Sequence, residues 1–241
     1  GLDTAFSYGD DVQQQVGAAV SKSTLERSDV FITSKVPCCP RSGITEWFDC
    51  SARRNASADA EHDLAMLGVD QVDLLLLHWP CEDFDDTLAA YRSMEPLVAA
   101  GKARAIGISN FNADGIKQLF AAGLKVTPSV NQCSMSLQQH DDETIDYCQG
   151  AGIVYESYHG MKGCPFSDPT LTAIADKHKK SAAQVCLRWV LERGAILATG
   201  TGADASKAAE YAKEDLDIFD FALTADEVDA LNELGAPAGA A

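Results

Sequence analysis

The sequence lacks a long hydrophobic run, since even the apolar stretch Leu74–Leu77 is short and lies between Asp73 and His78. A membrane-spanning helix needs about 20 consecutive apolar residues, so we expect no membrane insertion. The sequence also lacks a surplus of basic residues: 19 Lys and Arg stand against 36 Asp and Glu, and the net charge is −17. A surface this acidic repels phosphate groups, which argues against nucleic acids and anionic membranes as partners.

Although the sequence has eight cysteines, it lacks the C-x-x-C spacing of zinc and dithiol sites. We therefore expect no metal site, and reduced thiols in a reducing compartment, which favours the cytoplasm. An initiator Met and a recognisable signal peptide are also lacking, and the chain begins with Gly1-Leu2-Asp3, which reads as the end of a strand. We expect further residues upstream, which leaves an organellar targeting peptide open.

What the sequence does contain is an alternation of β-rich runs and helical patterns. Val12, Val16 and Val20 share one face of a helix, and the apolar run 73–77 reads as a strand buried on both faces, as in parallel sheets. Strands are expected at Leu2 and over 31–34, 73–77, 104–108, 129–132, 152–155 and 195–198, each followed by a helix.

Repeated βα units without a break predict one α/β domain, residues 1–241. Seven strands are one short of a (β/α)8 TIM barrel, so we expect the first strand and helix of the barrel upstream of residue 1. The alternative is an open, doubly wound sheet. A barrel that lacks one strand exposes two sheet edges, and we expect either upstream residues or a protein partner to cover them.

Polar residues follow the expected strands at the point where each strand ends. Asp3 ends the first strand and Tyr8 follows in the loop, while Lys35 and His78 end the next two strands. In an α/β barrel the carboxyl ends of all strands meet on one face, which holds the active site. Each residue taken singly has a structural explanation, such as a helix cap or a solvated lysine. Together they predict a catalytic group.

These four residue types suit acid–base chemistry on a carbonyl. A tyrosine hydroxyl has an ordinary pKa of about 10 and is a weak acid at neutral pH, but a neighbouring ammonium favours its ionised form. An aspartate paired with the lysine would fix the ammonium, and a histidine would donate a hydrogen bond to the carbonyl oxygen. The result would be an oxyanion hole with its own proton donor.

Three sequence motifs carry a resemblance to a known family. The run D-T-A-F-S-Y-G at residues 3–9 resembles the D-T-A-x-x-Y-G motif of the aldo-keto reductases, and residues 33–35 and 74–80 are similar to that family's lysine and histidine motifs. The resemblance extends from Asp3 to about Leu231. It implies a TIM barrel that reduces aldehydes or ketones with NADPH.

The resemblance also implies roles for individual residues. Tyr8 would be the general acid, Lys35 and Asp3 its tuning pair, and His78 the residue that orients the carbonyl. The runs G-I-S-N-F at 107–111 and N-Q at 131–132 are similar to family motifs as well. They imply that the carboxamide of the nicotinamide is held by Ser109, Asn110 and Gln132. Tyr158 falls on the tyrosine that stacks on the nicotinamide ring, a sound role for an aromatic face.

The run G-T-G-A-D-A at residues 200–205 lies after the last expected strand and before a helix. It matches a dinucleotide fingerprint, but no strand follows it, so we interpret it as a phosphate site at a helix N-terminus. The family's K-S-x-x-x-x-R-x-x-E-N motif would place Thr201 and Gly202 at its start, Lys207 at the Arg position and Glu210 at the Glu position. Because a lysine does not replace an arginine fork, we expect NADPH with NADH as an open alternative.

Two other functions stay open on the sequence. The altered phosphate motif leaves room for a catalytically weak or inactive relative that serves as a subunit of a larger assembly. Lys35 would alternatively be a Schiff-base nucleophile. An inactive subunit would differ from a reductase because it would not turn over the cofactor. A Schiff-base enzyme would differ because borohydride would trap a carbonyl adduct on Lys35.

Overall fold

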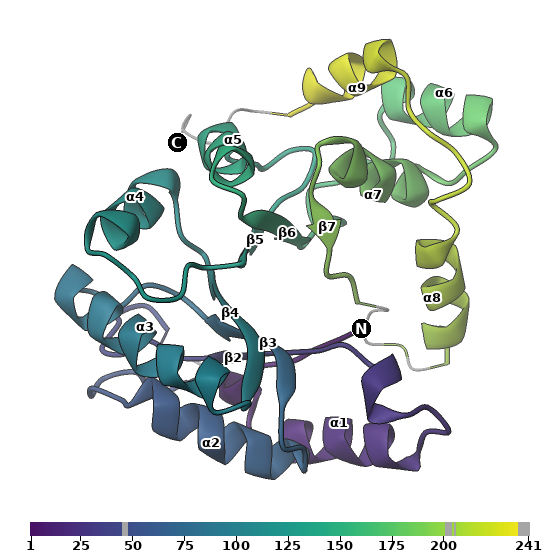
Figure 1. Ribbon diagram of the computed structural model, residues 1–241. Coiled ribbons are helices and arrows are strands. Elements are labelled where there is room, and N and C mark those ends of the chain that lie inside the picture. The colour runs from purple at the N-terminus through teal and green to yellow at the C-terminus, as the bar shows by residue number, and fades with distance from the viewer. Residues whose placement is uncertain (45–47, 201–203, 205, 236–241) are drawn as a thin grey trace. The chain divides into compact units, whose positions relative to one another are not determined.

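The computed structural model describes residues 1–44, 48–200, 204 and 206–235. Strands and helices alternate along the chain (Figure 1), and the chain divides into two compact units, Gly1–Asn131 and Gln132–Ala241. Within the described ranges, no helix is both long enough and apolar enough to span a membrane.

The first unit contains parallel strands that follow one another in chain order. Leu2 lies opposite Ile32, Thr33 opposite Leu74, and Leu74 opposite Ala105. The strands are β1 (Leu2–Asp3), β2 (Ile32–Val36), β3 (Val72–Leu77), β4 (Ala103–Ser109) and the beginning of β5 (Val130–Ser134); the helices are α1 (Asp10–Lys22), α2 (Ala56–Leu67), α3 (Phe84–Ala99) and α4 (Ala113–Ala121), with 3₁₀-helices at Phe6–Tyr8 and Arg27–Asp29.

The sequential order β1-β2-β3-β4 is the order of a barrel wall. A doubly wound sheet instead reverses its strand order at a switch point, where its ligands bind. The open-sheet alternative is therefore wrong for this unit. In consequence the strand ends that precede the βα loops all lie at the same edge of the sheet.

Strands β2 and β3 are buried on both of their faces. Every residue of these two strands is buried, and α1, α2 and α3 lie along one side of them (Figure 1). β2 nevertheless carries three polar residues, Thr33, Ser34 and Lys35. Buried polar groups need partners, so each of these side chains must be held by the residues around it.

Gly107 shows how closely β4 is packed. A Cβ at this position would collide with the carbonyl oxygen of Val130 and the side chain of Leu76. Only glycine lets the neighbouring backbone approach this closely. The packing of Leu74, Leu76 and Val130 in one apolar cluster depends on this contact.

The second unit contains the rest of β5, β6 (Val154–Tyr158) and β7 (Ile196–Leu197), and β6 pairs with β7 in parallel. Its helices are α5 (Asp142–Gly150), α6 (Pro169–His178), α7 (Ala182–Glu192), α8 (Ala208–Leu216) and α9 (Ala225–Asn232). Asp168 caps α6 and Pro169 lies in its first turn, where a missing N–H costs nothing.

The cysteines differ from the sequence expectation. Six of the eight form disulfides, and Cys133 and Cys148 are not disulfide-bonded. The pairs are Cys38–Cys81, Cys39–Cys50 and Cys164–Cys186. The prediction of reduced thiols throughout is therefore wrong. Pairing depends on which cysteines the fold brings together, and sequence separations of 43, 11 and 22 residues carry no sign of that.

Candidate active site

The strand ends of the first unit place the four predicted catalytic residues close together. Asp3 is the last residue of β1, Tyr8 the last of the 3₁₀-helix, and Lys35 the penultimate residue of β2. His78 follows β3 directly, and its backbone N–H donates to the carbonyl of Val36 at 2.9 Å. Parallel pairing thus brings Lys35 and His78 to the same end of the sheet.

Lys35 is the most buried member of this group. Its side chain is 2% exposed, and Nζ donates to Oδ1 of Asp3 and, at 3.0 Å, to the carbonyl of Thr4. The ammonium lies 5.5 Å from the centre of the Tyr8 ring. A positive charge is therefore fixed beside the tyrosine by one carboxylate and one carbonyl.

Tyr8 and His78 face each other across the site. Tyr8 is 47% exposed, and its ring meets the His78 ring edge-on at 6.1 Å between centres. Burial, with a smaller contribution from the charge of Lys35, lowers the pKa of His78 to about 3. The imidazole is therefore neutral at pH 7 and has only one N–H to donate.

Ser7 lies beside His78 and was not predicted. Its Oγ is 3.2 Å from Nδ1 of the imidazole, and the serine is buried. The position falls on one of the variable residues of the D-T-A-x-x-Y-G motif, so no motif pointed to this serine. A hydroxyl that donates to Nδ1 would place the ring proton on Nε2.

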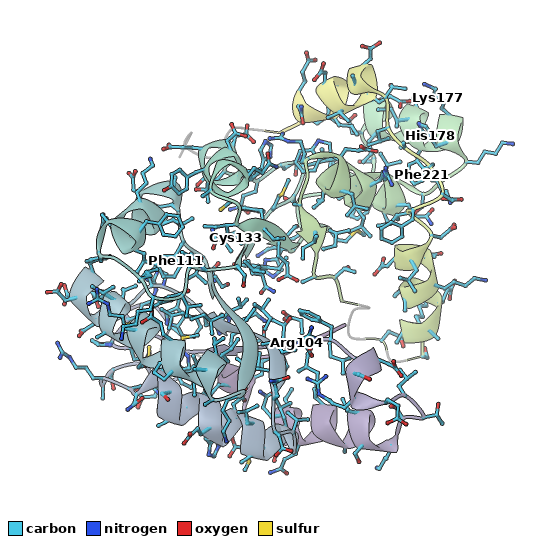
Figure 2. All side chains as sticks on the ribbon, viewed as in Figure 1. Arg104, Phe111, Cys133, Lys177, His178 and Phe221 are labelled. Carbon is cyan, nitrogen blue, oxygen red and sulfur yellow. A yellow bond between two sulfur atoms is a disulfide. The ribbon has the colours of Figure 1, made fainter. Side chains whose placement is uncertain are left out.

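Ser109 and Asn110 close the β4 end of the site. Ser109 is buried, whereas Asn110 is exposed and has a positive φ of 62°. Nδ2 of Asn110 donates to the carbonyl of His78 at 2.9 Å and to Oγ of Ser109 at 3.0 Å. Phe111 follows as a buried residue (Figure 2). These hydrogen bonds tie the end of β4 to the backbone that carries the histidine.

Aromatic side chains that were not singled out from the sequence surround this group. Phe48 packs edge-on against Phe6 at 6.0 Å and lies 6.3 Å from Trp79, measured between ring centres. The indole N–H of Trp79 donates to the carbonyl of Cys38 at 2.7 Å. The Cys38–Cys81 disulfide also joins the loop after β2 to the loop after β3 that carries Trp79.

The second unit carries the other predicted cofactor residues. Gln132 is buried in β5 and donates from Nε2 to Oε2 of Glu156 at 3.0 Å, a partner that the sequence did not indicate. Tyr158 ends β6 half-buried, with the His159 ring 4.7 Å from its own.

The predicted phosphate residues are described only in part. Lys207 directly precedes α8, and its Nζ lies 5.9 Å from the ring of Tyr211. Glu210 is exposed in the first turn of α8. Thr201 and Gly202 lie outside the described residues.

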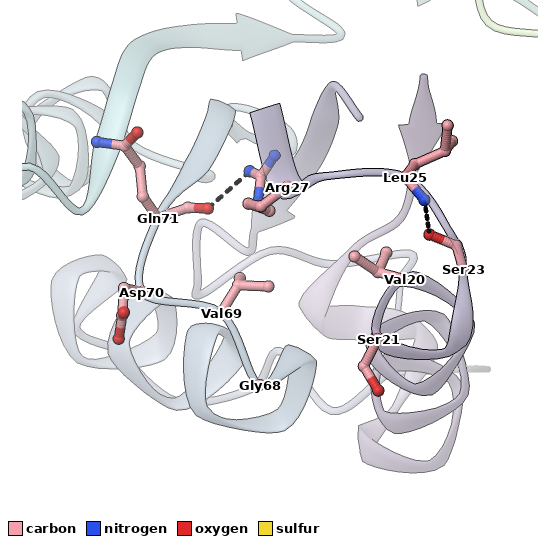
Figure 3. Close-up of a pocket in the computed structure, with 10 residues that line it drawn as sticks. Val20, Ser21, Ser23, Leu25, Arg27, Gly68, Val69, Asp70 and Gln71 are labelled. Carbon is pink, nitrogen blue, oxygen red and sulfur yellow. Dashed lines mark hydrogen bonds between the residues drawn. The ribbon is translucent and has the colours of Figure 1, made fainter. Parts of the chain in front are cut away.

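A separate hollow of about 400 Å³ lies at the C-terminal ends of α1 and α2 (Figure 3). Val20, Leu25 and Val69 supply apolar side chains, and Arg27 donates to the carbonyl of Gln71 at 2.8 Å. None of the predicted site residues lines it. Since Asp73 at the start of β3 pairs with the same arginine, the hollow is at the opposite end of the strand from His78.

Known proteins are similar to this chain over nearly its whole length. The model of the aldo/keto reductase family matches residues 1–164. Glyoxal reductase of Bacillus subtilis is 36% identical over 96% of this chain and 78% of its own length. Morphine 6-dehydrogenase of Pseudomonas putida is 33% identical over 97% of this chain and 77% of its own length.

Solved structures agree with these relatives. The crystal structure of an aldo/keto reductase from Brucella melitensis has a TM-score of 0.80 and 31% identity over 96% of this chain and 83% of that chain. A Bombyx mori aldo-keto reductase in complex with NADP has a TM-score of 0.79 and 30% identity over 97% of this chain and 77% of that chain. The predicted α/β barrel class is thereby confirmed.

The fold and these relatives define an oxidoreductase of the nicotinamide-dependent class. More particularly, the chain belongs to the aldo/keto reductase family. The family predicted from the motifs at residues 3–9, 33–35 and 74–80 is therefore confirmed.

Proposed function

We propose that this protein reduces aldehydes or ketones to alcohols with NADPH, and that Tyr8 is the proton donor. The observation that carries the proposal is the buried Lys35 ammonium, held by Asp3 and the Thr4 carbonyl beside the tyrosine ring. NADPH, when bound, supplies the hydride that the carbonyl carbon receives. The chain's own residues then have to bind the carbonyl oxygen and protonate it.

Tyr8 has the exposure that a proton donor to a substrate needs. The hydroxyl gives its proton to the carbonyl oxygen, and the nearby ammonium stabilises the phenolate that remains. Asp3 keeps the ammonium in place. Because Lys35 is buried and already ion-paired, it is a poor nucleophile, which argues against the Schiff-base alternative.

His78 orients the carbonyl as a neutral hydrogen-bond donor. Oγ of Ser7 lies 3.2 Å from Nδ1, and when this hydroxyl donates to Nδ1 the Nε2–H is the donor that the substrate oxygen meets. A neutral imidazole does not compete with Tyr8 as an acid at pH 7, because its pKa of about 3 leaves it without a second proton. The two side chains thus divide the work: one donates a hydrogen bond and the other a proton.

The proposed cofactor residues have side chains that suit the parts of NADPH. Ser109, Asn110 and Gln132 offer hydroxyl and amide groups for the carboxamide, and Tyr158 offers an aromatic face for the nicotinamide ring. Lys207 offers one cation for the 2′-phosphate, together with Thr201, Gly202 and Glu210 from the same segment. A single lysine is weaker than an arginine fork, so NADH stays the alternative.

The first test is NADPH consumption with a panel of aldehydes and ketones, beside the variant Tyr8→Phe. We expect wild-type turnover and a loss on the order of 10²-fold or more in kcat for the variant, because proton donation is removed while the ring stays. NADPH affinity should not change. Turnover of the variant at the wild-type rate would rule out Tyr8 as the donor.

The same assay separates the reductase from an inactive subunit. A wild-type protein that binds NADPH but turns over none of the carbonyls would favour the inactive relative, and loss of binding would implicate the altered phosphate segment. The single domain 1–241, the protein partner at a sheet edge and the cytoplasmic location stay predictions. The cytoplasmic location was inferred from reduced thiols, and the three disulfides remove that reason for it.

A further inference from the structure

Four buried polar side chains form a cluster beneath the proposed catalytic group. Asp63 of α2 accepts hydrogen bonds from Oγ of Ser34 and from Nε2 of Gln13. Oε1 of Gln13 in turn accepts from Oγ1 of Thr4. All four residues are at most 2% exposed, so water does not compete for these bonds.

The cluster touches both chain segments that hold the Lys35 ammonium. Ser34 directly precedes Lys35 in β2, and Thr4 directly follows Asp3. Thr4 makes three hydrogen bonds: its hydroxyl donates to Gln13, its backbone N–H donates to the carbonyl of Thr33 at 2.9 Å, and its carbonyl accepts from Nζ of Lys35 at 3.0 Å. A displacement of either segment would therefore move the ammonium relative to Tyr8.

A carboxylate at this place is costly. Burial raises the pKa of Asp63, while the hydrogen bonds from Ser34 and Gln13 lower it less. His62, when protonated, and Asp10 also act on the carboxylate at a distance; they lie 2.9 Å apart on the exposed side of α2 and α1. The two side chains that donate to Asp63, Ser34 and Gln13, are neutral.

Asp73 makes the contrast clear. It is also a buried aspartate, but it accepts from Arg27, Arg104 and the backbone N–H of Ile32. These donors outweigh burial, which by itself raises the pKa, and lower the pKa of Asp73 below its usual value. Asp73 has the charged donors that usually compensate a buried charge, whereas the donors to Asp63, Ser34 and Gln13, are neutral.

We propose that Asp63 is a positioning residue of the active site: it holds Ser34 directly and Thr4 through Gln13, and so fixes the Lys35 ammonium beside Tyr8. The expected effect on catalysis rests on the proposed function, in which Tyr8 is the proton donor. Asp63 acts only through these neighbours. Its geometric claim, that the cluster sets the place of the ammonium, is testable without turnover.

The test compares Ser34→Ala, Thr4→Val and Asp63→Ala in the full chain. The readout is the ultraviolet titration of the Tyr8 phenol, obtained as the difference between each protein and the same protein with Tyr8→Phe. A loosened ammonium stabilises the phenolate less, so we expect the ionisation midpoint to move up. In the active enzyme kcat should fall by on the order of tenfold to a hundredfold, with KM for NADPH unchanged.

Asp73→Asn is the matched control, since it changes a buried aspartate at the other end of β3. We expect it to lower the unfolding temperature without moving the phenol midpoint. Thr4→Val and Ser34→Ala should be non-additive with Asp63→Ala, because all three break one network. Should Asp63→Ala not fold, the two milder variants decide the matter.

Folded Ser34→Ala and Thr4→Val proteins with an unmoved phenol midpoint would overturn the inference. So would a shift of equal size in Asp73→Asn, since it would show a general effect of lost stability. A wild-type protein without turnover would refute the proposed function alone, because the titration still reports whether the cluster holds the ammonium.

Discussion

His78 is a residue whose environment decides its chemistry. In water an imidazole is about half protonated near pH 6.5, but here it is buried beside an ammonium and has a pKa of about 3. Between these two values the folded protein keeps the ring neutral while the unfolded chain takes up a proton. Stability must therefore fall as the pH is lowered through this window.

This difference gives a prediction for His78→Gln. We expect the wild-type free energy of unfolding to decrease from pH 7 to pH 5, and the variant to show a much smaller slope over this range, measured by urea unfolding. His159→Gln is the control. Burial also lowers the pKa of His159, but unlike His78 this residue is exposed. An equal slope in wild type and His78→Gln would contradict the buried, neutral histidine.

Helix α9 shows how one side chain serves a whole element. Glu227 forms a capping box with Thr224 and also accepts from Lys177 and His178 of α6, which Figure 2 labels. Burial by itself raises the pKa of Glu227, but these hydrogen bonds outweigh it and lower the pKa to about 2. The carboxylate thus holds the start of α9 against the end of α6.

Two substitutions separate the cap from the charge. Glu227→Ala should cost about 1–2 kcal/mol at pH 7, because it removes the acceptor of the Thr224 N–H and of the α6 donors while the Thr224 cap itself stays. Glu227→Gln keeps a capping box, so it should cost less at pH 7. Wild type should lose stability as the pH falls from about 4.5 toward 2, and the Gln variant should lack this pH-dependent loss. Urea unfolding at pH 7 and pH 3 measures both. Asp226→Asn, which changes an exposed neighbour, is the control. If Asp226→Asn lost as much stability as Glu227→Ala, the role assigned to Glu227 would be contradicted.

Most elements were predictable because the sequence repeats one unit with clear ends. The run 73–77 predicted β3, and the spacing of Val12, Val16 and Val20 predicted α1. The 3₁₀-helix at Phe6–Tyr8 was missed and read as a loop, since a single turn has no periodicity to detect. The catalytic four could be proposed from strand ends, whereas the Asp63 cluster could not. Its members come from four segments, and nothing in a lone Gln or Asp signals that they meet.

At the scale of the whole molecule, we expect the three disulfides to contribute to the free energy of unfolding. Titration of the unfolded, unreduced protein should find two free thiols, Cys133 and Cys148. Cys133→Ser combined with Cys148→Ser should leave none. Eight reactive thiols in the wild type would contradict the three pairs and restore the reduced state that the sequence alone favoured.

The Cys38–Cys81 pair is expected to contribute most, because it closes the longest loop, with a separation of 43 residues. Chain entropy gives about 4 kcal/mol for a loop of this length. Replacing both cysteines by serine should lower the free energy of unfolding by roughly that amount, measured without reductant. The Cys39–Cys50 pair, with a separation of 11, should give a smaller loss when treated in the same way. A larger loss for the shorter loop would show that chain entropy is not the main contribution.

The burial of Lys35 has one more consequence, for chemical labelling of the whole surface. An acylating reagent reaches amines that water reaches, and the Lys35 side chain is 2% exposed and bound on two sides. Lys207, which directly precedes α8, is exposed. Mild acylation would therefore tag the lysine proposed to grip the cofactor and spare the lysine beside Tyr8. A single reagent would weaken the binding of the dinucleotide while leaving the proton-transfer group chemically intact.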